Sequence, residues 1–76
     1  MTQLASERIV IDPGICHGKP VIRGTRTPVT VVLDAIAAGD EFKQICEDYD
    51  VTLDDIRACV AFASSEVNDQ TYVPLS

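Results

Sequence analysis

The chain has 76 residues, of which 12 are acidic and 6 are basic, so its formal net charge at neutral pH is −6. This length allows one domain with a thin core, and a hydrophobic content of 46% is too high for a disordered acidic tail. No apolar run approaches the roughly 18 residues that cross a membrane, and the first residues lack the basic and apolar regions of a signal peptide. We therefore expect a cytoplasmic protein without a membrane segment.

The charge is divided unevenly along the chain. Residues 1–30 carry four basic and two acidic side chains, whereas residues 31–76 carry two basic and ten acidic ones. Phosphate binding needs local positive charge, so the first part is the more favourable place for a nucleic-acid contact. The asymmetry is typical of two surfaces with two different partners, although two solvated faces would give the same pattern.

The cysteines and the single histidine do not form the pattern of a metal or catalytic site. Cys16, Cys46 and Cys59 are odd in number and contain no C-x-x-C pair, so we predict neither a disulfide framework nor structural zinc. Cys16 adjoins His17, but neighbours in sequence are not a ligand set, and no second histidine can complete one. We expect no metal, no cofactor and no enzymatic activity.

The N-terminal part is predicted to form a short β-hairpin or arm. Residues 1–7 have no periodicity and are expected to be loose, whereas residues 8–28 contain short β-branched runs separated by the turn signals Asp12-Pro13-Gly14 and Gly24-Thr25. An isolated hairpin is only marginally stable in water, so the arm should pack on helices or pair its open edge with a second copy. The three predicted extended pieces are residues 8–11, 21–23 and 26–29.

Two helices are predicted next, over residues 29–38 and 40–49, because the apolar residues follow a helical period there. Thr30 is the expected N-cap of the first helix and Gly39 its C-terminal stop, and Asp40 is the expected cap of the second. The residues predicted to face the core are Val29, Val32, Leu33 and Ile36 in the first helix and Phe42, Ile45, Cys46 and Tyr49 in the second.

A third helix is predicted over residues 52–66. Thr52 and Asp55 have the spacing of a capping box, and Val51 with Ile56 has that of a hydrophobic staple. Residues 68–76 lose the helical pattern and are expected to form a C-terminal tail, so the single domain covers residues 8–67. The predicted apolar face of the third helix consists of Ile56, Cys59, Val60, Ala63 and Val67.

The predicted fold is therefore mainly α, with the arm followed by a three-helix bundle of helix-turn-helix type. In such bundles the third helix enters the major groove of DNA with its first turns. Asp54 and Asp55 in that turn favour the helix dipole but would repel phosphates, which leaves Arg57 as the candidate for reading bases. Other cations must come from the arm, which can lie along the backbone or minor groove. These arm cations are Lys19, Arg23 and Arg26.

Two motifs resemble a known family. They are the run GKPVIRGTRTPV from Gly18 to Val29 and the pattern DY-x-x-(T)-L-x-D-I-R-A from Asp48 to Ala58. Both are similar to family 433 of the domains of unknown function, small bacterial and archaeal proteins often described as VapB-type antitoxins, and the resemblance covers about residues 9–63. It implies an N-terminal β element and a homeodomain-like helical bundle, usually in a dimer. It also implies a PIN-like ribonuclease toxin as partner, which the antitoxin would neutralise while helping to repress their shared operon.

Two functions remain open from the sequence. The first is an antitoxin that binds a PIN-like toxin and operator DNA as a homodimer or higher homo-oligomer. The second is a dimeric protein-interaction module of the same shape without DNA affinity, in which the arm forms the dimer and the acidic face meets a basic partner. Arg23 and Arg26 could serve the dimer or a ligand, or tie the arm to acidic residues of its own helices. The candidate nucleic-acid or interface residues are Lys19, Arg23, Arg26 and Arg57.

Overall fold

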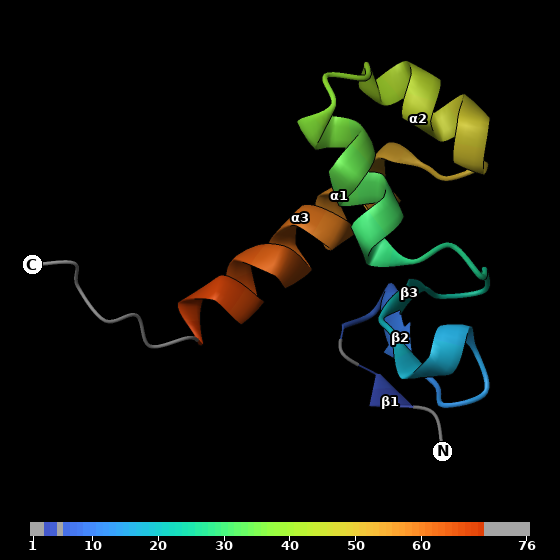
Figure 1. Ribbon diagram of the computed structural model, residues 1–76, viewed down its shortest axis with the longest axis vertical. Helices are drawn as coiled ribbons and strands as arrows, with labels where there is room; N and C mark the ends of the chain where they lie inside the picture. The colour runs from blue at the N-terminus through green and yellow to red at the C-terminus, as the bar shows by residue number, and fades with distance from the viewer. Residues whose placement is uncertain (1–2, 5, 70–76) are drawn as a thin grey trace, which may run out of the picture.

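A small antiparallel sheet precedes three α-helices in the computed structural model, which describes residues 3–4 and 6–69 (Figure 1). The predicted mainly α fold with an N-terminal hairpin is therefore confirmed. No helix in these residues is long and apolar enough to cross a membrane. The elements are β1 (Gln3–Leu4), β2 (Ile9–Ile11), the 3-10 turn η1 (Cys16–Gly18), β3 (Val21–Ile22), α1 (Val29–Ala37), α2 (Phe42–Tyr49) and α3 (Leu53–Asn68).

The sheet has the order β1-β2-β3, and both neighbouring pairs are antiparallel. Ile9 lies opposite Ile22 and Val10 opposite Val21, and all four side chains are buried. Side chains alternate between the faces of a strand, so both faces of this hairpin are covered. The pairing of β1 with β2 falls on residues that were expected to be loose. Backbone hydrogen bonds form this edge strand, and a two-residue strand leaves no side-chain period to detect.

The predicted turn signals end the strands as expected. The Gly14 amide donates to the Asp12 carboxylate at 2.8 Å, an Asx turn that leads out of β2. Gly24 has a φ of 79°, and the amide of Thr25 donates to the carbonyl of Ile22 at 3.0 Å. This geometry is that of a turn that favours glycine at its third position. The last predicted extended piece is reduced to a single bridge between Val21 and Pro28.

The starts of α1 and α2 differ from the prediction. α1 begins at Val29, before the predicted cap Thr30, and the Val29 amide donates to the carbonyl of Pro20 in the arm at 3.0 Å. Neither α1 nor α2 has a side-chain cap. Asp40 is not the N-cap of α2, because its amide closes the end of α1 on the carbonyl of Ala35 at 3.1 Å. Gly39, with a φ of 90°, is the predicted stop of α1 and provides the left-handed residue of this motif.

α3 begins with the predicted capping box. The Asp55 amide donates to the Thr52 hydroxyl at 3.1 Å, and the Thr52 amide donates to the Asp55 carboxylate at 3.0 Å. Two amides that have no partner within the helix are satisfied in this way. Residues 50–52 form the short link between α2 and α3, as a helix-turn-helix requires. α3 runs to Asn68, two residues beyond its predicted end, and residues 70–76 of the predicted tail lie outside the described residues.

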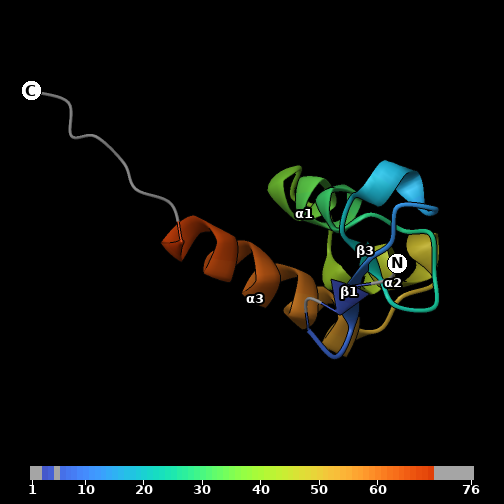
Figure 2. The ribbon, with the colours of Figure 1, turned by 90° about the horizontal axis from the view of Figure 1, so that it is seen from below.

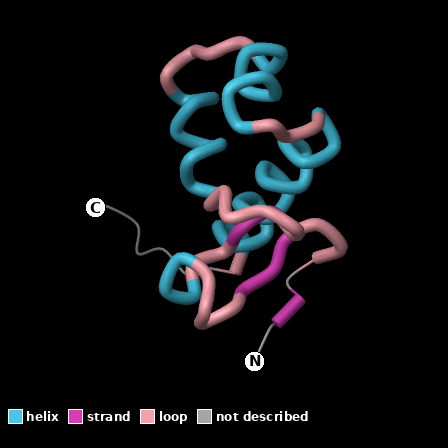
Figure 3. Tube along the Cα trace, turned by 90° about the vertical axis from the view of Figure 1, so that its right-hand side faces the viewer, coloured by secondary structure: helices cyan, strands magenta, loops and turns pink. Residues whose placement is uncertain are grey.

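The core lies where the sheet, α1 and the first half of α3 meet, with α2 contributing Ile45. Figure 3 shows the strands gathered at one end of the helices. Two aromatic residues predicted to face this core do not reach it, since Phe42 is 48% exposed and Tyr49 is 38% exposed. The predicted helical period of α2 is confirmed. Because α2 is short and lies at the edge of a thin core, Ile45 is its one buried residue. The buried cluster comprises Ile9, Ile22, Val29, Val32, Ala35, Ile45, Val51, Ile56 and Cys59.

Candidate functional site: the arm and the start of the third helix

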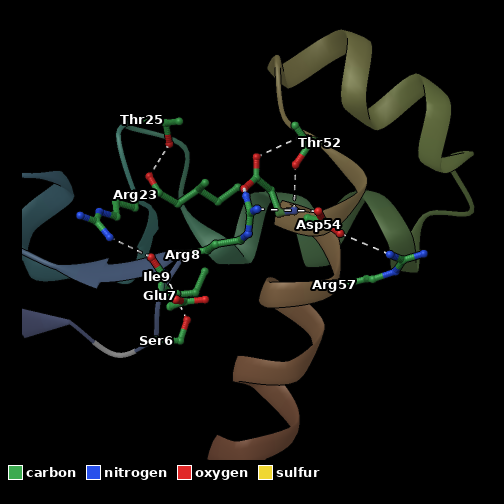
Figure 4. A network of polar contacts seen from close by, with 11 residues as sticks. Ser6, Glu7, Arg8, Ile9, Arg23, Thr25, Thr52, Asp54 and Arg57 are labelled. Atoms are coloured by element: carbon green, nitrogen blue, oxygen red, sulfur yellow. Dashed lines mark hydrogen bonds and ion pairs between the residues drawn. The ribbon is translucent and has the colours of Figure 1, made fainter.

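Arg8 connects the arm to the start of α3 (Figure 4). It immediately precedes β2, and its guanidinium Nη1 donates to Asp55 Oδ1 at 2.9 Å, while Nη2 lies 3.7 Å from Asp54 Oδ2. The Asp55 side chain is only 14% exposed, whereas those of Arg8 and Asp54 are 47% and 62% exposed. Asp55 is therefore the sheltered partner of this contact, and such a charge-assisted bond is stronger than one between neutral groups.

Burial, Thr52 and Arg8 together determine the pKa of the Asp55 carboxylate. Partial burial alone would raise the pKa of Asp55, but hydrogen bonds from Thr52 and the charge of Arg8 outweigh it and hold the pKa below its usual value of 3.8. Asp55 is thus negatively charged at neutral pH. It joins the helix cap and the arm through the two oxygens of one carboxylate.

Two of the four predicted site cations have local partners. Arg57 Nη1 lies 3.3 Å from Asp54 Oδ1 on the adjacent turn of α3, with its side chain 77% exposed. Arg23 Nη1 donates to the backbone carbonyl of Glu7 at 3.3 Å. Arg23, Arg8 and Asp55 also line one cleft of about 530 Å³. Arg57 is therefore paired with a carboxylate, at the position on α3 where a base-reading residue would have to contact DNA.

The other two predicted cations, Lys19 and Arg26, lie on adjoining loops. Lys19 follows η1, and the thiol of Cys16 in that turn donates to the backbone carbonyl of Arg26 at 3.4 Å. Both residues are exposed, and within residues 3–4 and 6–69 neither side chain forms an ion pair. Lys19 and Arg26 therefore form the part of the arm whose charge is available to an anionic ligand.

A groove of about 860 Å³ separates the arm from one side of α3. The apolar residues of its lining are Ile11 from β2 and Ala58, Ala61 and Phe62 of α3. The walls carry charges of both signs, from Arg8, Glu7, Asp54, Arg57 and Glu66. The arm therefore lies beside the small alanines of α3 across this groove.

Arg8 is the residue that the sequence did not identify. One of the alternatives for Arg23 and Arg26 was to tie the arm to the acidic helices, whereas Arg8 forms both ion pairs between the arm and α3. Arg8 and Asp55 are separated by 47 residues, so no local spacing connects them. The available signal was that Asp55 belongs to a capping box, which fixes its carboxylate at the edge of the helix nearest the arm.

No described group of three or more His, Cys, Asp or Glu side chains could hold a metal ion within residues 3–4 and 6–69. Cys59, on the core side of α3, is fully buried, whereas Cys16 and Cys46 are half-buried. Burial, with a smaller contribution from the charge of Asp55, raises the pKa of the Cys59 thiol to about 11. The thiolate is the nucleophilic form of cysteine, so Cys59 is inert at neutral pH.

This gives a testable prediction for the native protein. At pH 8, N-ethylmaleimide should modify Cys59 only after urea has unfolded the chain, because the thiol is both covered and protonated. Cys16, which is half-buried, provides the internal comparison. The measurement is the time course of labelling of each cysteine peptide by mass spectrometry. Equal rates at Cys59 and Cys16 without urea would show that this part of the core opens readily.

Comparisons with known proteins place the chain in a family. The family DUF433, described as "Protein of unknown function", matches residues 9–63. A protein of Mycobacterium tuberculosis (strain ATCC 25618 / H37Rv), named "Putative antitoxin VapB45", is 35% identical over 57 residues. The match covers 75% of this chain and 24% of the relative, so the chain spans about a quarter of that relative's length. No solved structure gives a significant match. Because the family match covers the arm, α1, α2 and most of α3, the chain belongs to the DUF433 family.

Proposed function

We propose that this protein is the antitoxin of a toxin–antitoxin pair, acting in the cytoplasm as a homodimer that binds a PIN-like toxin and operator DNA. The observation that carries the proposal is the 35% identity over 57 residues to a protein named as an antitoxin. The uneven charge supports it, because the arm and the acidic helices suit partners of opposite sign. The short strand β1 at the edge of the sheet is the proposed site of pairing between two copies.

In this proposal Lys19 and Arg26 contact DNA phosphates. They are the two candidate cations whose side chains have neither an ion pair nor a hydrogen bond in the described part of the chain, and a dimer would present each of them twice. The first turn of α3 is less suitable for the major groove, because Asp54 is exposed there and Arg57 already lies beside it. Binding would then depend on the backbone of DNA more than on its bases.

The DNA contact is tested by titrating the protein against the DNA upstream of its own reading frame at two salt concentrations. The double variant Lys19→Gln/Arg26→Gln should bind at least about tenfold more weakly at low salt, with a shallower salt dependence, because each lost phosphate contact removes about 0.9 from the logarithmic slope. Lys43→Gln is the matched control, since Lys43 is an exposed cation on α2, away from the arm. Equal weakening by the control would remove Lys19 and Arg26 as the contact.

The second candidate function is the interaction module without DNA affinity, and the carboxylates at the start of α3 favour it. Absence of any retarded complex at micromolar protein would select this function over DNA binding. The antitoxin assignment itself is tested by purifying the chain together with the product of the adjacent reading frame. A stable complex in which a ribonuclease is inhibited is the expected result, and failure of the two proteins to associate would refute it.

A further inference from the structure

The start of α3 carries an exposed carboxylate between two arginines, as Figure 4 shows. Asp54 Oδ1 lies 3.3 Å from Arg57 Nη1, and Asp54 Oδ2 lies 3.7 Å from Arg8 Nη2. Asp54 therefore joins a cation of the arm to a cation of the helix. We call these three residues the Asp54 bridge. The bridge lies at the end of α3 that contacts β2, and the helix extends away from it, as Figure 1 and Figure 2 show.

The Asp54 bridge is not needed to hold α3 in place. The capping box is formed by Thr52 and Asp55, and Asp54 takes no part in it. Arg8 also donates to Asp55 at 2.9 Å, so the arm stays tied to α3 without Asp54. Ion pairs between exposed groups contribute little to stability, and the three side chains of the bridge are 47%, 62% and 77% exposed. Asp54 therefore matters more for what this surface binds than for the fold.

Asp54 determines the net charge of this surface. Arg8 and Arg57 contribute two positive formal charges, and Asp54 and Asp55 contribute two negative ones, so the four side chains sum to zero. Without the carboxylate of Asp54, the same surface would be positively charged. A guanidinium has five N–H donors, more than one carboxylate can occupy, so each arginine retains donors for a second anion. The negative charge of Asp54 repels that anion.

The Asp54 bridge adjoins the part of the arm that is proposed to contact DNA. Arg8 lines a cleft together with Arg23 and Gly24. These two residues belong to the turn of residues 22–27, which also contains Arg26. A DNA duplex carries one phosphate charge for about every 1.7 Å of its axis. A duplex held at Arg26 would therefore present further phosphates to the bridge.

We infer that Asp54 is a negative determinant of DNA binding, which holds the guanidinium groups of Arg8 and Arg57 and keeps them from DNA phosphates. This inference rests on the proposed function. Like charges that are brought together at an interface suppress association, and Asp54 would meet phosphates wherever the first turn of α3 approached DNA. The phosphate contacts are thereby restricted to Lys19 and Arg26.

The test compares the affinity of the full chain for two labelled duplexes, the DNA upstream of its own reading frame and an unrelated sequence of equal length. Fluorescence anisotropy is measured at about 0.1 M salt, where exposed charges more than about 10 Å apart are largely screened, and at a higher salt concentration. Asp54→Asn should bind both duplexes at least about fivefold more tightly, and its logarithmic salt dependence should steepen by about 0.9 for each arginine released.

Glu47→Gln is the matched control, because Glu47 is an exposed carboxylate on α2 and the change in net charge is the same. Its affinity for either duplex should change by less than about twofold, since its charge lies outside the bridge. Circular dichroism spectra and urea midpoints equal to those of the wild type show that each variant is folded.

A second substitution separates the release of Arg57 from a general change of charge. Arg57→Gln should weaken binding by less than about twofold in the wild type, where Asp54 holds the guanidinium, but by at least about threefold in Asp54→Asn. A general effect of charge would give the same factor in both backgrounds.

The outcomes distinguish this inference from the proposed function. Affinity of Asp54→Asn no higher than that of Glu47→Gln, or equal effects of Arg57→Gln in the two backgrounds, would overturn the inference and leave the contact by Lys19 and Arg26 in place. If Asp54→Asn bound DNA and the wild type did not, the inference would hold and the DNA-binding part of the proposed function would fail. If neither protein bound either duplex at micromolar concentration, both would be overturned.

Discussion

Replacing Ile56 by alanine is expected to lower the free energy of unfolding by roughly 2–5 kcal/mol, the usual cost of truncating a buried isoleucine. Ile56 is 1% exposed and belongs to the buried cluster that joins α3 to the sheet and to α1. It is also in the first full turn after the capping box. Because a domain of this size is held by a thin core, the variant should be largely unfolded at room temperature. Urea denaturation followed by circular dichroism measures the effect.

Val60→Ala is the control for this substitution. Val60 is β-branched, lies on the same helix one turn later and is 46% exposed. Its truncation should change the free energy of unfolding by no more than about 0.5 kcal/mol, as for most surface positions. If the two variants lost similar stability, the isolated protein would bury Val60, in contradiction to its exposure in the structure.

Asp55→Ala should produce the second large loss, about 1–2 kcal/mol from the hydrogen bond that its carboxylate accepts from the Thr52 amide and up to about 1 kcal/mol from the ion pair with Arg8. Both contributions depend on the same carboxylate, which accepts from the Thr52 amide at 3.0 Å and from Arg8 at 2.9 Å. Asp54→Ala is the matched control, because Asp54 is adjacent, 62% exposed and outside the capping box. In thermal or urea unfolding, Asp55→Ala should be clearly less stable than Asp54→Ala.

The pH dependence of the same pair gives an independent check. The pKa of Asp55 is lower in the folded protein than its ordinary value of 3.8, so its contribution is fully present above that value and is lost as pH falls through the folded pKa. Wild-type protein should therefore lose stability more steeply in acid than Asp55→Ala. The measurement is the urea midpoint of both proteins between about pH 6 and pH 2.5. Parallel curves would show that Asp55 is not a source of the acid sensitivity.

Local signals in the sequence predicted much of the fold. The capping box of Thr52 and Asp55, the stop at Gly39 and the turn at Asp12 each depend on residues within a few positions of one another, and the structure has all three. The predicted N-caps of α1 and α2 were wrong because these helices begin without a side-chain cap. The Val29 amide is satisfied by Pro20 from the arm, and Asp40 is used by the end of the preceding helix.

Helical periodicity located the apolar faces but could not tell how far the core extends. Ile45 and Ile56 are buried as predicted, whereas Phe42, Tyr49 and Val67 follow the same period and remain exposed. Which turns of α2 and α3 are covered depends on the neighbouring elements, which is a property of the packed arrangement and not of either helix alone. A pattern within one helix cannot report where its partner ends.

The candidate site was predicted in its residue types more than in its arrangement. An ion pair from the arm to the acidic helices was one alternative for Arg23 and Arg26, and in the structure Arg8 forms it. The four candidate cations differ in their neighbours. Arg57 pairs with Asp54 and Arg23 donates to the Glu7 carbonyl. Only the three-dimensional structure distinguishes these two cations from Lys19 and Arg26. Their roles toward DNA or a second copy stay predictions.

The separation of Arg8 and Asp55 by 47 residues also bears on the order in which the chain assembles. Helices form from local contacts in microseconds or less, whereas closing a long loop costs chain entropy before its contact can repay it. We expect α1, α2 and α3 to associate first and the arm to dock on them last. In a partly folded chain, the hairpin edge and the carboxylate of Asp55 would therefore both be accessible. A second copy could then exchange its arm with the first, with Arg8 of one chain completing the helix cap of the other.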